Sequence, residues 1–211
     1  MFDKFIRKIS EQLGKLLPGE DAQFLMAPLL RKKGVSSVEK ENAKTASVLV
    51  LFYPHLQSVY VPFILRASYE GTHSSQISFP GGKFDAEDVD LRNTAIREAK
   101  EEIGVHPEKI KILGKLTPLY IPPSNFLVHP FVGYTNERPD FSIDKNEVES
   151  LIEVDIVDFL DESKIKMKPI IHRSTGALMD TPYFDIHNQV IWGATAMMIS
   201  ELKIILHEAL K

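Results

Sequence analysis

Three glutamates near the middle of the chain, Glu98, Glu101 and Glu102, are spaced i, i+3 and i+4. On a helix, this spacing places all three side chains on one face. Carboxylates held so close repel one another unless a cation lies between them, and several oxygen ligands suit a hard divalent ion such as Mg²⁺ or Mn²⁺. A solvated acidic helix face shows the same pattern, so the three residues indicate a metal site only with support from their neighbours.

The residues around the glutamates supply that support. Gly81 and Gly82 lie upstream, where glycines let backbone groups approach a ligand or adopt positive φ. Arg97 directly precedes the first glutamate and stands four residues before Glu101, and Gly104 is a helix stop signal. The pattern therefore predicts a metal site on a helix that follows a glycine turn.

Hydrophobic periodicity and turn residues predict the elements that position this site. Helices are predicted over residues 2–16, 22–30, 91–103 and 194–210. Strands are predicted over residues 46–53, 59–67, 76–79, 110–116, 126–135, 154–160 and 183–186, the sixth ending in a short helix. Residues 119–126 and 167–182 are predicted to be loops that shape a substrate pocket. Because strands and helices alternate without a regular βαβ repeat, we expect an α/β (α+β) fold with a mixed sheet between helices.

Composition excludes several classes of protein. With 211 residues, 44% of them hydrophobic, the chain is long enough for one catalytic domain with a sizeable core. The net charge of −4 gives no basic surface for nucleic acid or for an anionic membrane. The chain has no cysteine, which excludes disulfides and thiolate metal sites and is compatible with a reducing, cytoplasmic location. We expect no signal peptide and no membrane span, since no run of about 18 apolar residues occurs.

Residues 81–105 resemble the Nudix box, in which Gly, five residues, Glu and seven residues precede Arg-Glu-apolar-x-Glu-Glu-x-Gly-apolar. Residues 97–105 fill every specified position of the second half. The first half is one residue longer than the standard box, counted from Gly82 to Arg97, and an aspartate, Asp88, stands at its first acidic position. The role of Asp88 stays open at this point.

The longer spacer resembles the coenzyme A pyrophosphatase branch of the Nudix hydrolases. That branch also has an upstream signature, of which this chain supplies Arg66, Ala67 and residues 79–82, Phe-Pro-Gly-Gly. It departs from the signature at Gly71, where the branch has an arginine, and at Ser75, where the branch has a glycine.

Further segments resemble the same branch. They are residues 146–148, Asn-Glu-Val, and residues 190–196, which open the last helix, so the resemblance extends over most of residues 46–205. It implies a Nudix-type α-β-α sandwich at residues 45–211, preceded by an N-terminal helical extension at residues 1–44. The N-terminal and last helices make a homodimer a reasonable expectation.

The resemblance also implies an activity, the hydrolysis of a nucleoside diphosphate linked to another moiety. Coenzyme A or an acyl derivative is the first expected substrate. Another nucleotide, such as ADP-ribose, NADH or a dinucleoside polyphosphate, is an alternative, and so is a non-catalytic ligand sensor. Isomerase chemistry on a prenyl diphosphate also occurs on this fold, but it normally needs a catalytic cysteine, which this chain lacks.

Residue roles follow from the resemblance position by position. The implied metal ligands for Mg²⁺ or Mn²⁺ are Glu98, Glu101, Glu102 and the Gly82 carbonyl. Arg97 is implied to orient a box carboxylate. The general base is a box glutamate or a loop glutamate, Glu147 or Glu149, of which Glu147 matches the branch better.

The residues expected to bind substrate phosphates are Arg66, Lys83, Gly81 and Gly82, with His73 as a weaker candidate beside them. A histidine near a glycine turn is more often a packing residue. For Trp192 we favour a core aromatic at a helix entrance over a ligand contact.

Overall fold

The computed structural model describes residues 1–29, 31, 42–68, 75–172 and 176–211, so Gly71 and His73 lie outside the described residues. The helices are α1 (Phe2–Leu13), α2 (Gly19–Phe24), α4 (Leu91–Ile103), α5 (Ile156–Leu160) and α6 (Gly193–Leu210). The strands are β1 (Lys44–His55), β2 (Ser58–Arg66), β3 (Ile77–Ser78), β4 (Gly81–Lys83), β5 (Lys111–Lys115), β6 (Leu119–Ile121), β7 (Phe126–Tyr134), β8 (Val148–Asp155), β9 (Ile165–His172), β10 (Ala177–Ile186) and β11 (Gln189–Trp192). Short 3₁₀ helices occupy Pro107–Lys109, Pro122–Ser124 and Glu162–Lys164.

The main sheet is mixed, as predicted. β1 runs parallel to β7 and antiparallel to β2 and β4, while β5 and β6 pair with β7, and β3 and β8 pair with β2. Residues 49–53 of β1 are all fully buried. Such a continuous buried run is typical of a strand whose two faces are both covered.

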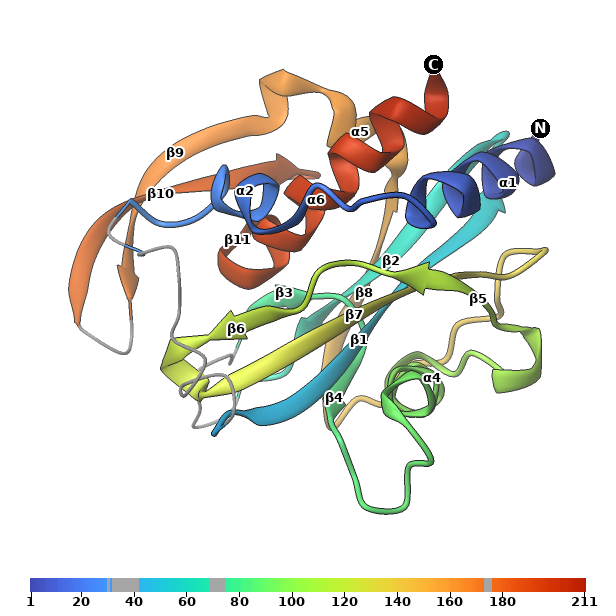
Figure 1. The fold of residues 1–211 in the computed structure, drawn as a ribbon. Coiled ribbons are helices and arrows are strands. Elements are labelled where there is room, and N and C mark those ends of the chain that lie inside the picture. Colours follow the sequence, from blue (N-terminus) through green and yellow to red (C-terminus); the bar gives the residue numbers. More distant parts are fainter. Residues whose placement is uncertain (30, 32–41, 69–74, 173–175) are drawn as a thin grey trace.

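Helices cover both faces of this sheet, with α4 on one side and α6, α1 and α2 on the other (Figure 1). On the α4 side, Ala95, Ala99 and Ile103 pack in one buried cluster with Leu49 and Leu51 of β1. On the other side, the rings of Phe5 and Phe52 meet edge to face with centroids 5.2 Å apart. The α-β-α sandwich expected from the sequence is confirmed.

The ends of α4 are fixed by Asp90 and by Gly104, the second of which the sequence indicated as a stop signal. The Asp90 side chain accepts a hydrogen bond of 2.8 Å from the Asn93 amide and caps the first turn. Gly104 closes the helix at φ +74°, a left-handed conformation that a side chain disfavours. The predicted helix over residues 91–103 is therefore correct to the residue.

Two segments predicted to be loops are strands instead. Residues 167–182 belong largely to β9 and β10, which pair with each other and join β11 in a separate three-stranded sheet beside α6 (Figure 1). The sequence did not indicate strands over residues 167–182, because each strand contains a proline, Pro169 in β9 and Pro182 in β10, and β9 is largely exposed. Residues 119–126 likewise begin with the short strand β6 before a turn at Pro122–Ser124.

The strand predicted to begin at residue 154 starts earlier, at Val148. This strand carries Glu149, Ser150 and Glu153, so polar residues mask the strand pattern. Within the described residues, no helix is both long enough and apolar enough to cross a membrane.

A fully buried carboxylate joins distant parts of the fold. Glu201 of α6 accepts hydrogen bonds from the Gly19 amide at the start of α2 (3.1 Å) and from Gln23 Nε2 (2.9 Å). It also accepts bonds from the amide and the hydroxyl of Thr117, the hydroxyl at 2.6 Å. This one side chain therefore connects α2, α6 and the segment between β5 and β6.

Candidate active site

A tight glycine turn forms the floor of the candidate site. Gly81 has φ +156°, and a Cβ atom at this position would lie 2.3 Å from the Ser47 carbonyl oxygen of β1. At Gly82, a Cβ atom would lie 2.5 Å from the carboxyl group of Glu98. Glycines are therefore required on both counts, because β4 lies directly between β1 and the acidic face of α4.

Glu102 is the most buried of the three glutamates on α4. Its Oε2 accepts a hydrogen bond of 2.8 Å from the Gly81 amide, and its Oε1 lies 3.2 Å from Arg66 Nη1. Burial raises the pKa of Glu102 to about 7; Arg66 and the Gly81 amide oppose the rise, and the charges of Glu98 and Glu147 add to it. Sequence-distant Glu147 is thus brought close to the α4 carboxylates.

Glu98 lies beside the same turn, with 13% of its side chain exposed. Its Oε1 lies 2.9 Å from Arg97 Nη1. Burial raises the pKa of Glu98, Arg97 opposes the rise, and the charges of Glu101 and Glu147 add to it. Negative charge therefore accumulates where α4 faces Gly82.

Arg97 holds four oxygen groups together. It donates two hydrogen bonds to Asp88, of 2.9 and 3.1 Å, and one of 3.2 Å to the Lys83 carbonyl. Its Nη1 donates to Glu101 Oε2 at 2.8 Å. Asp88, whose role the sequence left open, is the main partner of Arg97, and Glu101 is turned outward with 56% of its side chain exposed.

The Asp88–Arg97 pair predicts a specific acid sensitivity. Hydrogen bonds from Arg97 lower the pKa of Asp88 from 3.8 to about 2. The pair stabilises the fold fully above about pH 4, and this contribution is lost as the pH falls through 2. We expect Asp88→Asn to lower the unfolding free energy at pH 7 by about 1–2 kcal/mol, a figure reduced for solvent screening, and to make less difference at lower pH. Urea unfolding of both proteins between pH 7 and 2.5 measures this; a difference independent of pH would contradict it.

The other predicted residues lie around the same turn. The Glu147 backbone carbonyl accepts a hydrogen bond of 2.9 Å from the Ala67 amide, which follows Arg66 at the end of β2. The side chains of Lys83 and Glu147 are exposed, as is Glu149 on β8. The structure thus brings Arg66, Gly81, Gly82 and Glu147 together with the glutamates of α4.

The donor set suits a hard divalent cation. Among the residues that the structure describes, no three acidic or histidine side chains already converge at metal-binding separation. The reason is visible in the contacts, since Glu98 and Glu101 contact Arg97 while Glu102 contacts Arg66. All the candidate donors are nevertheless carboxylate or carbonyl oxygens. Burial first, and then the charges of neighbouring carboxylates, raise the pKa values of Glu98 and Glu102, and a divalent ion would relieve this excess of negative charge.

A pocket of about 270 Å³ opens beside the glycine turn. Arg66, Gly82 and Lys83 line it at the glycine turn, and its wall also includes Phe126 and Trp192. Trp192 is only partly buried, so the expectation of a core side chain is wrong for this residue. Its place at a strand–helix junction was visible in the sequence, but its exposure to a pocket was not.

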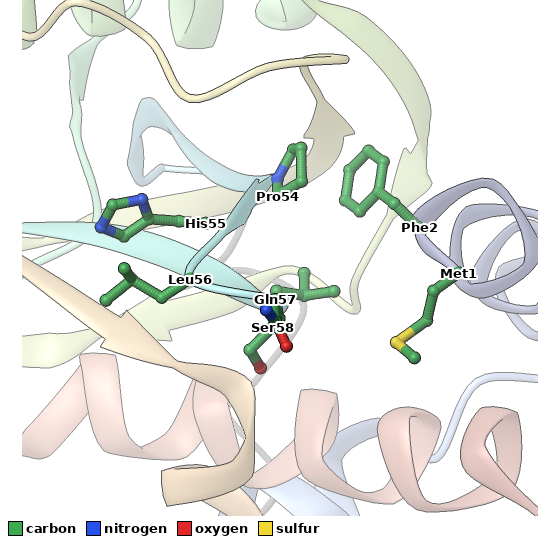
Figure 2. Close-up of a pocket in the computed structure, with 8 residues that line it drawn as sticks. Met1, Phe2, Pro54, His55, Leu56, Gln57 and Ser58 are labelled. Atoms are coloured by element: carbon green, nitrogen blue, oxygen red, sulfur yellow. The ribbon is translucent and has the colours of Figure 1, made fainter.

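A second pocket, of about 520 Å³, lies far from these groups. Figure 2 shows it between Met1 and Phe2 at the start of α1 and the β1–β2 turn at residues 54–58. His55 in this turn is seven residues beyond Val48, the β1 partner of Gly81, which corresponds to roughly 23 Å along a strand. Since no carboxylate lines this pocket, the acidic site and the pocket beside it are the candidate for chemistry.

Alanine substitutions at the two adjacent glycines, Gly81 and Gly82, are expected to have different effects on stability and activity. Gly82→Ala places its Cβ against the flexible end of Glu98, so we expect folding to survive and activity to fall by about 10-fold to 100-fold. Gly81→Ala meets the backbone of Ser47 and Val48 and carries an unfavourable φ, so we expect it to lower the unfolding free energy by about 2 kcal/mol or more. Thermal unfolding and turnover of both variants separate the two effects; equal losses of stability would contradict the assignment.

Comparison with known proteins agrees with this geometry. Residues 42–174 match the model of the NUDIX domain family. The chain is 34% identical over 137 residues to a protein named "Uncharacterized Nudix hydrolase NudL" from Yersinia pestis (strain Pestoides F), covering 65% of this chain and 67% of that one. A protein of the same name from Yersinia pseudotuberculosis (serotype O:1b, strain IP 31758) gives the same values.

A mixed sheet between helices, with an acidic helix behind a glycine turn, is the arrangement expected of a hydrolase of the Nudix class. The chain belongs to the Nudix family, whose members hydrolyse nucleotide-linked pyrophosphates. The fold agrees with a solved structure, the Nudix hydrolase RenU from M. smegmatis, at a TM-score of 0.52 and 14% identity, covering 77% of this chain and 85% of that one.

Proposed function

We propose that this protein hydrolyses the pyrophosphate bond of coenzyme A or an acyl-coenzyme A in a reaction that depends on Mg²⁺ or Mn²⁺. The observation that carries the hydrolytic part is the cluster of Glu98, Glu102 and Glu147 at the glycine turn beside a pocket. Coenzyme A is favoured by the Phe-Pro-Gly-Gly sequence after Arg66 and by the lengthened box.

The metal ligands proposed are Glu98, Glu101, Glu102 and the Gly82 carbonyl. When bound, the ion neutralises phosphate charge and lowers the pKa of a water molecule, so that hydroxide is available near neutral pH. The protein's own part is to hold these oxygens in place. Arg97 does so for Glu98 and Glu101, and Asp88 in turn fixes Arg97.

The phosphate groups of the substrate are proposed to lie between Arg66 and Lys83. Arg66 uses Nη1 for Glu102 and the Gly81 carbonyl, and a guanidinium has five N–H donors, so within the described part of the chain its other donors remain for phosphate oxygens. Lys83 is exposed at the same glycine turn. The amides and carbonyls of Gly81 and Gly82 complete the proposed phosphate site.

Glu147 is the proposed general base. Its side chain is exposed, while its charge raises the pKa of both Glu98 and Glu102, so it lies at the acidic cluster without being enclosed by it. A carboxylate in this position accepts a proton from the attacking water. A box glutamate or Glu149 is the alternative base.

Further proposals concern the protein as a whole. We propose residues 45–211 as the Nudix hydrolase domain, residues 1–44 as its helical extension and the cytoplasm as its location. A small nucleotide is the proposed partner, with a homodimer as the proposed assembly. The alternatives of another nucleotide substrate, such as ADP-ribose, and of a non-catalytic sensor are kept as outcomes of the experiment below.

A substrate panel tests the proposal. Coenzyme A, acetyl-coenzyme A, ADP-ribose, NADH and diadenosine polyphosphates are incubated with Mg²⁺ or Mn²⁺, beside the Glu98→Gln variant. We expect 3′,5′-ADP and a phosphopantetheine from the coenzyme A compounds, and no turnover in the variant. Cleavage of another compound would keep the enzyme class and change the substrate, whereas binding without turnover across the panel would favour the sensor.

A further inference from the structure

Trp192 occupies a position that the backbone fixes on both sides. It is the last residue of β11, extended at φ −137° and ψ 180°, and pairs with Tyr183 of β10. Gly193 follows at φ +64° and opens α6. The strand pairing and the sharp turn hold the Trp192 backbone in place, and the partly buried side chain forms part of the pocket wall.

The pocket is lined by two charged residues and an otherwise neutral wall. The charged residues, Arg66 and Lys83, lie at the glycine turn, where Arg66 donates to the Gly81 carbonyl and Lys83 follows Gly82. The remaining wall is neutral and mainly apolar, and includes Ile121, Phe126 and Met198 besides Trp192. Within the described part of the chain this neutral wall offers no charged partner, so a second phosphate group would lose its water there without compensation.

We propose that Trp192 is a specificity-determining residue, which packs against the uncharged group joined to the substrate's diphosphate. The inference rests on the proposed function, in which Arg66 and Lys83 bind the diphosphate at the glycine turn and leave the neutral wall for the group joined to it. Two chemistries share the required character: a nucleobase, which stacks on an indole face, and an amide-containing alkyl chain such as pantetheine, which lies along it.

Trp192 is the only tryptophan of the chain, so its fluorescence reports on this pocket directly. The wild-type protein is excited at a wavelength selective for tryptophan and titrated separately with AMP, with 4′-phosphopantetheine and with inorganic pyrophosphate. AMP carries the nucleobase, 4′-phosphopantetheine carries the alkyl chain, and pyrophosphate carries phosphate groups only. We expect one of the first two to change the emission, which identifies the group, and pyrophosphate to leave it unchanged.

A displaced reporter is the control for general conformational change. In the double variant Trp192→Phe, Tyr60→Trp, the single tryptophan lies on β2 beside His55, at the end of the strand away from Arg66. The emission of this displaced tryptophan is expected to stay unchanged with every compound. The inference would be overturned if neither AMP nor phosphopantetheine changed the emission of wild-type Trp192. It would also be overturned if the displaced tryptophan responded equally.

Kinetics give a second, independent readout. Trp192→Ala is expected to raise KM about 10-fold to 100-fold with little change in kcat, and Trp192→Phe to restore most of the loss, with folding checked by circular dichroism. An unchanged KM in Trp192→Ala would overturn the inference while leaving the hydrolase proposal intact. If ligands changed the Trp192 emission but no substrate were turned over, the hydrolase proposal would be overturned and the inference on Trp192 would stand.

Discussion

Glu98→Gln is expected to reduce turnover by at least about 10³-fold, because metal-ion stabilisation of phosphoryl chemistry contributes several kcal/mol. Glu98 lies against Gly82 within the acidic cluster, and glutamine keeps its shape but removes the charge. Glu101→Gln is expected to cost less, about 10-fold to 100-fold, because Glu101 is half-exposed and bonded to Arg97. Steady-state kinetics on the substrate identified by the panel gives both values.

Metal titration separates this effect from misfolding. Calorimetric titration with Mn²⁺ should show weakened binding in Glu98→Gln, with the thermal unfolding temperature changed little. If Glu98→Gln kept turnover within 10-fold of the wild-type value, Glu98 would be excluded as a metal ligand. If Glu101→Gln were the more damaging of the two, the metal would lie on the outer side of α4.

Glu201→Ala is expected to lower the free energy of unfolding by about 3–5 kcal/mol. The substitution leaves the donors of Gly19, Gln23 and Thr117 without their acceptor in a fully buried place, and each buried unpaired donor costs about 1–3 kcal/mol. For a chain of this size the unfolding temperature should fall by roughly 8–15 °C. Chemical denaturation and calorimetry measure the two quantities.

Glu208→Ala is the matched control on the same helix. Glu208 is half-exposed and pairs with Lys211 at 2.7 Å, and such surface pairs contribute about 0–1 kcal/mol. If Glu201→Ala and Glu208→Ala destabilised the protein equally, the buried network would not hold α2 to α6. Glu201 is remote from the acidic cluster in the contacts that it makes, so the kinetic constants of the folded Glu201→Ala variant should stay near the wild-type values.

Local signals in the sequence were sufficient for α4 and the central strands. α4 combines a capping aspartate, Asp90, with a terminating glycine, Gly104, and β1 is a continuous apolar run. The strand predicted over residues 183–186 is the second part of β10, but β9 and the first part of β10 were not predicted, because each strand contains a proline and the two strands pair with each other rather than in the main sheet. Their strand character is therefore set by tertiary contacts.

The residues that form the site could be predicted from the sequence, but the orientation of their side chains could not. Helical spacing places Glu98, Glu101 and Glu102 on one face, yet their carboxylates turn to different partners because Arg66 and Gly81 contact Glu102 from distant segments. The pairing of Arg97 with Asp88 could not be predicted either, because the first half of the box is one residue longer than the standard pattern. Counting residues cannot show that the loop before α4 returns Asp88 to that arginine, since the return depends on the loop's conformation.

The packing of α1 and α2 onto α6 has a consequence for the order of synthesis. α1 and α2 are made before the whole main sheet, and α6 is made after it, so α1 and α2 remain without their α6 neighbour through most of translation. Contacts between segments so far apart in sequence form slowly and expose apolar surface meanwhile. The half of the core that covers the pocket side of the sheet is thus completed only when the last helix leaves the ribosome.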